Sequence, residues 1–279
     1  MSVSVQVLRR NNALLGWLAF VSQAFIAISV EIGDELGRAL FSQHGTVEGV
    51  DNARRIVAFE VAHGVFMEPA WQIFFEHTHQ VLMLTVTWAE SARVMNGIYV
   101  LGHVFVTLGV ACWMFFFRRS LFPLFRNALI LVNVFALVIY EYFPTAPPRL
   151  TGPLIYNHHA FVFQDTLFGI VNAAGKTVGT EAGFNEFSAM PSIHMGWALI
   201  VGVAIIVAGR PAVVKGLGLL YPALMLLAIV VTGNHYLLDA GAAAMLVVLA
   251  FIVAGSFECW RGTRRWPHLV QRQTGRSAP

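Results

Sequence analysis

Long apolar runs separated by polar connections dominate the pattern of this chain. A helix that crosses the hydrocarbon core of a membrane needs about 20 apolar residues, and lipid offers no partner for free backbone groups, so such runs must be helical. The runs that qualify lie near residues 13–30, 95–117, 127–143, 192–209, 212–232 and 236–257. The pattern therefore predicts an all-α integral membrane protein with six transmembrane helices.

The segment between the first two predicted spans is less regular. Residues 51–68 mix apolar and charged positions at helical spacing, which is typical of a helix lying in the membrane interface. Residues 70–88 are more apolar but contain Glu76, His77 and His79, so we expect a re-entrant or interfacial helix there. If this second stretch crossed the membrane instead, the chain would have seven spans.

The basic residues determine the expected orientation. Only 12% of the 279 residues are charged, about half the share in an average soluble domain. With six spans and a cytoplasmic N-terminus, most of the 18 Lys and Arg residues fall in cytoplasmic segments, as the positive-inside rule requires. We therefore expect a multi-pass protein of the cell membrane with both termini in the cytoplasm. The net charge of +3 follows from this placement and does not indicate nucleic-acid binding.

This topology divides the chain into three regions. Residues 1–94 are expected to hold a retained signal-anchor helix and the extracytoplasmic interfacial helices, because no small-residue cleavage site follows the first apolar run. Residues 95–257 form the membrane core, in which we expect the catalytic site, and 258–279 form a basic cytoplasmic tail. The outer loop 144–191 is long for a membrane protein, and long ordered loops are often functional.

Three short polar segments fall at one membrane depth on the extracytoplasmic side. They are 142–150 (YFPTAPPRL), 188–194 (SAMPSIH) and 232–239 (TGNHYLLD). Two predicted helices begin at this depth, and a helix start presents free N–H groups and the positive end of its dipole, which bind anions. The segments therefore predict a phosphate-binding site.

The side chains of these segments suit phosphate chemistry. Arg149 supplies a fixed positive charge with a fork of donors. His235 and Asp239 are four residues apart on one helix face, so the carboxylate can hold one ring nitrogen and leave the other free to react. His194 supplies a second ring for proton transfer, and Asn234 is expected at the N-cap of the last helix.

Other polar residues have a structural and a functional interpretation. Tyr99 and His103 are also four residues apart, and they either face the site or form a packed polar pair. His158 and His159 are adjacent, but no third ligand at helical spacing accompanies them, so we expect no metal and no cofactor. A single histidine at a membrane interface is more often structural than catalytic, whereas an intramembrane carboxylate such as Asp239 is rare and usually paired.

The order of these motifs resembles the type 2 phosphatidic acid phosphatase superfamily, which shares its fold with vanadium haloperoxidases. That family has the signature blocks K-x6-R-P, P-S-G-H and S-R-x5-H-x3-D. Arg149 matches the arginine of the first block, and residues 191–194 match the second with Ile193 in place of glycine. His235 and Asp239 match the third block. The sequence FPTAPPR at residues 143–149 is most similar to the inositolphosphotransferase branch, which includes inositol phosphorylceramide synthases.

The resemblance covers roughly residues 95–257 and is incomplete where the family binds phosphate. Tyr142 and Leu150 stand in place of the lysine and proline of the first block. Ile229 stands in place of the arginine of the third block. Two of the family's cations are therefore absent, and Lys176 in the long loop is a candidate replacement.

The resemblance implies a phosphohistidine mechanism without a metal. His235, oriented by Asp239, would attack phosphorus, and His194 would protonate the leaving oxygen and then deprotonate the acceptor. Arg149, the Ser192 hydroxyl and the helix-start amides would hold the phosphoryl oxygens, where charge builds in the transition state. The remaining candidate substrate-binding residues are Tyr99, His103, Tyr142 and Asn234.

Three functions remain open at this point. A membrane phosphotransferase would move a phosphoryl group or phospho-headgroup between lipids, and the FPTAPPR block and the missing cations favour it. A lipid phosphate phosphatase would use water as the acceptor and act on phosphatidic acid or a polyprenyl phosphate. A non-catalytic transporter or scaffold would retain only a decayed site. The expected partners are the membrane, a lipid phosphate and a lipid or water acceptor, and the sequence leaves the oligomeric state open.

Overall fold

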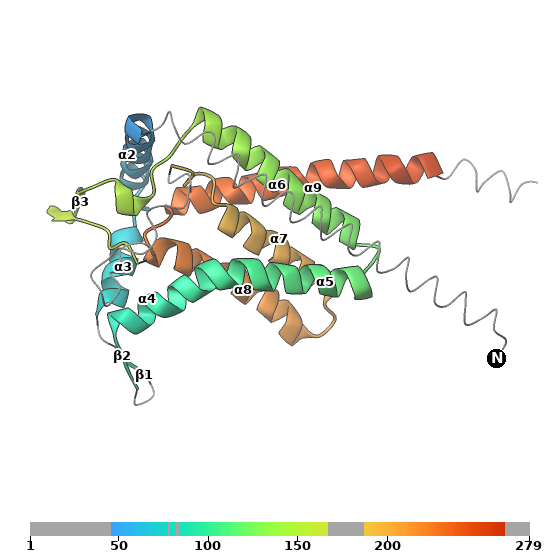
Figure 1. Cartoon of the computed structure of the whole chain (residues 1–279), viewed down its shortest axis with the longest axis horizontal. Helices are drawn as coiled ribbons and strands as arrows, with labels where there is room; N and C mark the ends of the chain where they lie inside the picture. The colour runs from blue at the N-terminus through green and yellow to red at the C-terminus, as the bar shows by residue number, and fades with distance from the viewer. Residues whose placement is uncertain (1–45, 78, 82–83, 167–186, 266–279) are drawn as a thin grey trace, which may run out of the picture.

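The long apolar helices lie together in a bundle, and a cap of short helices and hairpins covers one end of it (Figure 1). The structure is a computed structural model that describes residues 46–77, 79–81, 84–166 and 187–265. The expected first span at 13–30, Lys176 and most of the basic tail lie outside the described residues.

Helices account for most of the described residues, with two antiparallel hairpins in the cap. The elements in chain order are α2 (Thr46–Ala62), α3 (Glu68–Glu76), β1 (His79–Val81), β2 (Leu84–Val86), α4 (Trp88–Gly97), the π-helix η2 (Ile98–Val106), α5 (Thr107–Phe117), α6 (Phe122–Tyr142), the 3-10 helix η3 (Pro148–Leu150), β3 (Leu154–Tyr156), β4 (His159–Phe161), α7 (Ile193–Ala208), α8 (Ala212–Val231) and α9 (Leu237–Arg265).

Four helices in the described part are long and apolar enough to cross a membrane. They are Trp88–Phe117, Phe122–Tyr142, Ala212–Val231 and Leu237–Gly262. The shorter apolar helix α7 has 16 residues, which corresponds to about 24 Å at 1.5 Å per residue. These helices coincide with five of the predicted spans, and the total of six stays a prediction.

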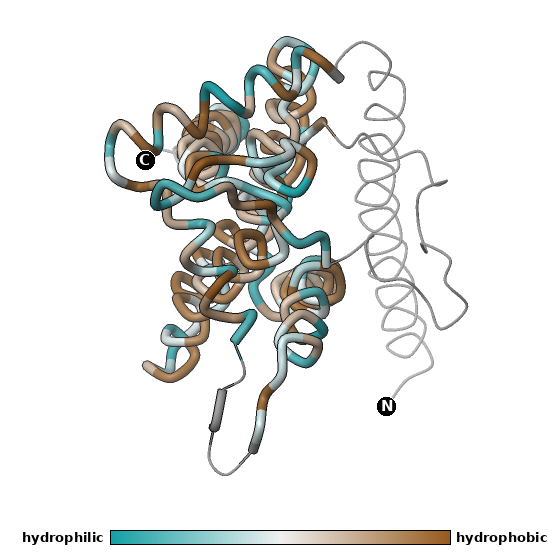
Figure 2. Tube along the Cα trace, turned by 90° about the vertical axis from the view of Figure 1, so that its left-hand side faces the viewer, coloured by the Kyte–Doolittle hydropathy of each residue, from teal (hydrophilic) through white to brown (hydrophobic). Residues whose placement is uncertain are grey.

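The outer faces of the bundle carry large apolar side chains. Val213, Leu219 and Met245 are exposed, and Figure 2 shows hydrophobic positions along the helices of the bundle. Exposed apolar surface of this extent marks contact with a partner or with lipid. Together with the helix lengths, it indicates a multi-pass membrane protein.

Helix α7 occupies the centre of the bundle and packs against α5, α6, α8 and α9. Gly202 permits its close approach to α8, because a Cβ atom there would lie 2.5 Å from the carbonyl oxygen of Gly218. Ser192 is the N-cap, and its hydroxyl accepts the N–H of Met195 at 3.3 Å. The start of α7, where His194 lies, is therefore fixed by a side-chain cap and by packing.

The stretch 70–88 is not the single re-entrant or interfacial helix that we expected. α3 ends at Glu76 and the hairpin β1–β2 follows, in a stretch rich in residues that favour strands. Thr87 and Glu90 then form a capping box, with the backbone N–H of Thr87 2.8 Å from the Glu90 carboxylate. The helix that contains the second predicted span therefore begins at Trp88, and the expected region boundary at 94 lies within this helix.

The two ends of the long loop 144–191 pair with each other. The N–H of Thr145 donates to the carbonyl oxygen of Phe187 at 2.6 Å, and the N–H of Ala189 donates to Thr145 at 3.1 Å. Between these ends lie η3 and the hairpin β3–β4. The pairing brings the end of α6 beside the start of α7.

Candidate functional site

Backbone hydrogen bonds join the three polar segments. The N–H of Arg149 donates to the carbonyl oxygen of Gly233 at 3.0 Å, and the N–H of Ser192 donates to that of Asp239 at 3.2 Å. Gly233 has a φ of +68°, and a Cβ atom on it would lie 3.2 Å from the carbonyl oxygen of Gln164. The site therefore requires glycine at this position. The three segments, which the topology places at one membrane depth, contact one another.

The imidazole of His235 is held at one nitrogen. Nδ1 lies 2.8 Å from the carbonyl oxygen of Ala189 and 3.5 Å from Oδ2 of Asp239. A carbonyl oxygen only accepts, so Nδ1 carries the proton and Nε2 carries the lone pair. Nε2 is buried and has no hydrogen-bond partner among the described residues. The ring therefore presents an unbonded, nucleophilic nitrogen inside the site.

Asp239 is fully buried and serves two groups. Asp239 lies in the first turn of α9. Its Oδ2 accepts the N–H of Tyr236 at 2.9 Å and lies 3.5 Å from Nδ1 of His235. The N-cap expected at Asn234 is therefore wrong, because α9 begins at Leu237 and carboxylates accept its first N–H groups.

The side chain of Asn234 instead positions Arg149. Nε of Arg149 donates to Oδ1 of Asn234 at 3.0 Å, and Nη1 lies 3.3 Å from Oδ2 of Asp165. The amide of Asn234 is fixed in turn by Thr232, whose hydroxyl lies 2.8 Å from Nδ2. The guanidinium side chain is 6% exposed, so its charge acts in a largely desolvated place. Sequence reasoning missed Asp165, which belongs to no motif.

His194 lies in a column of rings. Its centroid is 3.8 Å from that of Tyr99, with the planes 15° apart, and 4.4 Å from that of His103. His103 stacks in turn on Trp197 at 4.4 Å. Tyr99 and His103 lie on the π-helix η2, a form that is frequent at functional sites. The structure thus places this pair against His194, whose ring centroid is 6.0 Å from that of His235.

Tyr142 is the predicted substrate-binding residue that the structure does not bring to the cluster. Its side chain is 81% exposed at the end of α6. Tyr140, two residues earlier and therefore on another side of the helix, is buried and donates its hydroxyl to the carbonyl oxygen of Pro191 at 2.7 Å. α6 turns Tyr142 outward, so the structure does not place its side chain beside the histidines, and its role in substrate binding stays a prediction.

Two buried glutamates beside the cluster were also missed. Oε1 of Glu60 accepts the N–H of Leu238, and Oε1 of Glu68 accepts that of Leu237, each at 2.7 Å. Both carboxyl groups are fully buried, and burial raises the pKa of Glu60 to about 9 and that of Glu68 above its ordinary value. In the segment 51–68, charged and apolar residues are mixed at helical spacing, and this pattern indicated only a helix in the membrane interface.

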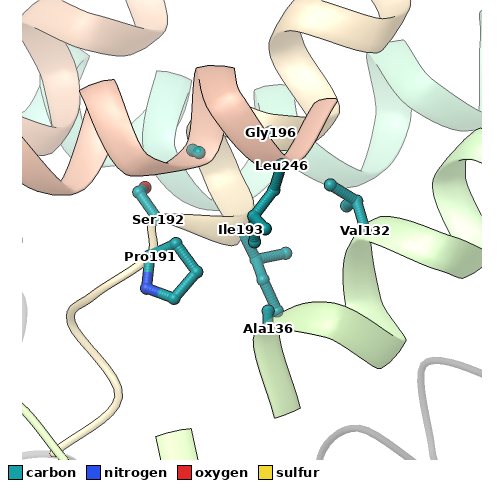
Figure 3. A pocket seen from close by; sticks show the side chains of 8 residues that line it. Val132, Ala136, Pro191, Ser192, Ile193, Gly196 and Leu246 are labelled. Carbon is teal, nitrogen blue, oxygen red and sulfur yellow. The ribbon is translucent and has the colours of Figure 1, made fainter. Parts of the chain in front are cut away.

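A narrow apolar gap, too small to hold a water molecule, lies beside Ser192 (Figure 3). Its lining converges from α6, α7 and α9 and includes Val132, Ala136, Ile193 and Leu246. Apart from the Ser192 side chain, these apolar side chains offer no donor or charge to a phosphate. Within the described ranges, no group of three or more His, Cys, Asp or Glu side chains is placed to hold a metal ion.

Comparison with known proteins identifies the family of the chain. The model of the PAP2 superfamily matches residues 65–253, which is more than half of the chain. Among solved structures, the chain is similar to the crystal structure of Aquifex aeolicus LpxE, with a TM-score of 0.44 and 15% sequence identity. That alignment covers 67% of this chain and 93% of the other. No curated protein matches the chain significantly.

Proposed function

Because this chain belongs to the PAP2 superfamily, we propose that it transfers a phosphoryl group or phospho-headgroup between two lipids at His194 and His235. The superfamily is that of the type 2 phosphatidic acid phosphatases, so the chain is a membrane enzyme that acts on lipid phosphates. The family match agrees with the superfamily expected from the motifs, and the inositolphosphotransferase branch is part of the proposal.

The observation that carries the proposal is the state of His235. The carbonyl of Ala189 holds the Nδ1 proton, and the Asp239 carboxylate lies beside it. The lone pair on Nε2 is therefore available, and a positive charge that forms on the ring in the reaction is stabilised from the Nδ1 side. This arrangement supports nucleophilic attack on phosphorus.

In the first half of the reaction, Nε2 of His235 forms a bond to phosphorus while the bond from phosphorus to the donor's alcohol oxygen breaks. His194 gives its proton to that oxygen, and the donor alcohol leaves. In the second half, His194 removes the proton from the acceptor hydroxyl, whose oxygen attacks phosphorus and displaces Nε2. Both histidines return to their starting forms, so the cycle consumes no further proton.

The phosphoryl oxygens need positive partners during these steps. Arg149 is fixed at the site by Asn234 and Asp165, and the N-terminus of α7 begins at Ser192. We propose that these two features hold the developing negative charge, with Tyr99 and His103 positioning the ring of His194. Asn234 then acts through Arg149 and does not contact the substrate.

We favour a lipid hydroxyl over water as the acceptor. His235 is 4% exposed and Asp239 is fully buried. Because little water reaches His235, a covalent intermediate on its ring is protected from hydrolysis. Hydrolysis is the second candidate function, and the partly exposed His194 favours it, because water can reach the proton carrier.

We also place the site on the extracytoplasmic side, with both termini in the cytoplasm. The distribution of Lys and Arg residues, most of which would then lie in cytoplasmic segments, supports this orientation. The substrate would enter sideways from the outer leaflet, with its acyl chains along the exposed apolar helix faces.

The test is an assay of the purified full chain with phosphatidylinositol as donor and a lipid alcohol as acceptor. The proposal predicts an acceptor lipid that carries the phosphoinositol headgroup, with diacylglycerol released from the donor, and the loss of both products in His235→Ala. The matched control is His158→Ala, an exposed histidine in the turn of the β3–β4 hairpin, which keeps the activity. Inositol phosphate as the sole phosphorus product, without a modified acceptor lipid, would show that water is the acceptor and would replace the transferase by the hydrolase. Unchanged turnover in His235→Ala would refute both.

A further inference from the structure

Two glutamates from separate helices meet at the first turn of α9. Glu60 lies on α2 and Glu68 opens α3, and they accept the N–H groups of Leu238 and Leu237. Asp239 accepts the N–H of Tyr236 in the same turn. The backbone that carries His235 and Asp239 is therefore held by carboxyl groups from three elements.

The surroundings of the two Oε2 atoms indicate how many protons Glu60 and Glu68 hold together. Oε2 of Glu60 and Oε2 of Glu68 are buried and receive no donor from the described residues. The two side chains are in hydrogen-bond contact with each other, and carboxylates only accept. One proton on the pair supplies a donor between the two carboxyl groups, whereas two ionised groups would repel each other and have no donor between them.

The surroundings favour a single negative charge on Glu68. Its side chain also accepts its own backbone N–H in the first turn of α3, so it lies at the starts of two helices. Glu60 accepts an N–H group at one helix start only. It faces Glu68 from α3, Asp239 from α9 and Tyr236, which directly precedes α9. No basic side chain acts on either glutamate in the described part of the chain, and burial followed by the charge of Glu68 raises the pKa of Glu60 to about 9.

We propose that Glu60 and Glu68 are positioning residues for the phosphoryl transfer. As an acid–carboxylate pair that shares one proton, they fix the first turn of α9 and so hold His235 against Ala189 and Asp239. Neither glutamate touches the reacting atoms. This inference rests on the proposed function for its kinetic consequence, but the shared proton stands on the geometry of the pair.

Loss of the shared proton has a defined effect. It leaves Glu60, Glu68 and Asp239 ionised around one helical turn, and all three side chains are fully buried. The repulsion loosens the turn and displaces Nε2 of His235 from its line of attack. Activity therefore falls as pH rises toward 9, through the pair and not through the histidines.

Glu60→Gln tests this directly, because its amide copies the protonated acid. The amide oxygen accepts the N–H of Leu238 and the NH2 group donates to the Glu68 carboxylate, but there is no proton to lose. We expect a kcat close to that of the natural chain at pH 7 and the loss of the alkaline decline. Glu48→Gln, at an exposed position on the same helix, keeps the natural profile.

The double variant Glu60→Gln, Glu68→Gln places two NH2 groups against each other and removes the charge. We expect its kcat to fall by about 10²-fold, the order of loss that an ångström of misplacement causes, with KM nearly unchanged. An alkaline decline in Glu60→Gln equal to that of the natural chain would overturn the proposal, as would equal kcat in the double variant.

Infrared spectroscopy of the pair gives a readout independent of turnover. At pH 7 the natural chain and Glu48→Gln show the carbonyl absorption of a buried protonated carboxylic acid, and Glu60→Gln lacks it. An identical absorption in all three proteins would overturn the shared proton. If the natural chain turned over no lipid phosphate, the proposed function and the kinetic role would fail, while the infrared result would still decide the protonation of the pair.

Discussion

His235 donates its Nδ1 proton to the backbone carbonyl of Ala189, 2.8 Å away. The carboxylate of Asp239 is farther from the same nitrogen, at 3.5 Å. The tautomer is therefore fixed by a main-chain atom of the loop before α7, and Asp239 adds charge to an arrangement that is already oriented. In this site the carbonyl of Ala189 selects the tautomer and Asp239 contributes charge, whereas in other triads the carboxylate alone selects the tautomer.

Asp239→Asn tests whether Ala189 or Asp239 orients the ring of His235. Because Ala189 still fixes the tautomer, kcat should fall by less than the ~10⁴-fold loss seen when removal of the carboxylate gives the wrong tautomer. The measurement is kcat beside that of His235→Ala, with Asp51→Asn at an exposed position of α2 as control. A loss in Asp239→Asn as complete as that in His235→Ala would show that Asp239 does the orienting.

Arg149→Lys should lower kcat/KM by about 10- to 100-fold, because hydrogen bonds to charged groups contribute about 1.5–3 kcal/mol each. An ammonium cannot contact Asn234 and Asp165 in the geometry of the guanidinium fork. Arg54→Lys is the matched control, since Arg54 forms an exposed ion pair with Asp51. Equal kcat/KM in the two variants would remove Arg149 from the phosphate site.

The two tyrosines at the end of α6 should behave differently. Tyr142→Ala should leave kcat/KM within about twofold, as is usual for surface positions. Tyr140→Phe loses the hydrogen bond to Pro191 and should lower the free energy of unfolding by about 1 kcal/mol. Chemical denaturation and turnover measured on both variants check this, and a large kcat/KM loss in Tyr142→Ala would restore it to the site.

The shared proton of Glu60 also predicts how stability depends on pH. The pKa of Glu60 rises from 4.5 to about 9 in the folded chain, so the folded state keeps a proton that the unfolded chain releases. This contribution to stability is complete below pH 4.5 and is lost as pH rises toward 9. Glu60→Gln lacks this dependence. Thermal unfolding between pH 5 and 9 should therefore shift in favour of the variant as pH rises, and a constant difference between the two Tm values would contradict the assignment.

The apolar runs and the short polar segments were sufficient to locate five of the helices and to place His194, His235, Asp239 and Arg149 in one region. Chain-local patterns carry this information, because span length and the i,i+4 spacing of His235 and Asp239 are set by helix geometry. The family match supports the superfamily that these motifs indicated.

Other features depend on contacts between distant residues and have no local pattern. Glu60 and Glu68 lie 178 and 169 positions from the amides that they accept, so nothing near them in the sequence indicated this role. The same contacts explain why Asn234 is not the N-cap. The exposure of Tyr142 at the end of α6 and the π-helix around Tyr99 likewise have no local pattern in the sequence.

The most direct test of the central claim is to trap the covalent intermediate. The full chain is mixed with a radiolabelled lipid phosphate in the absence of acceptor, quenched in alkali and digested, and the labelled peptide is sequenced by mass spectrometry. The account predicts an acid-labile phosphoryl group on Nε2 of His235, absent in His235→Ala and discharged by acceptor lipid. Turnover without a labelled histidine, or a label on another residue, would contradict it.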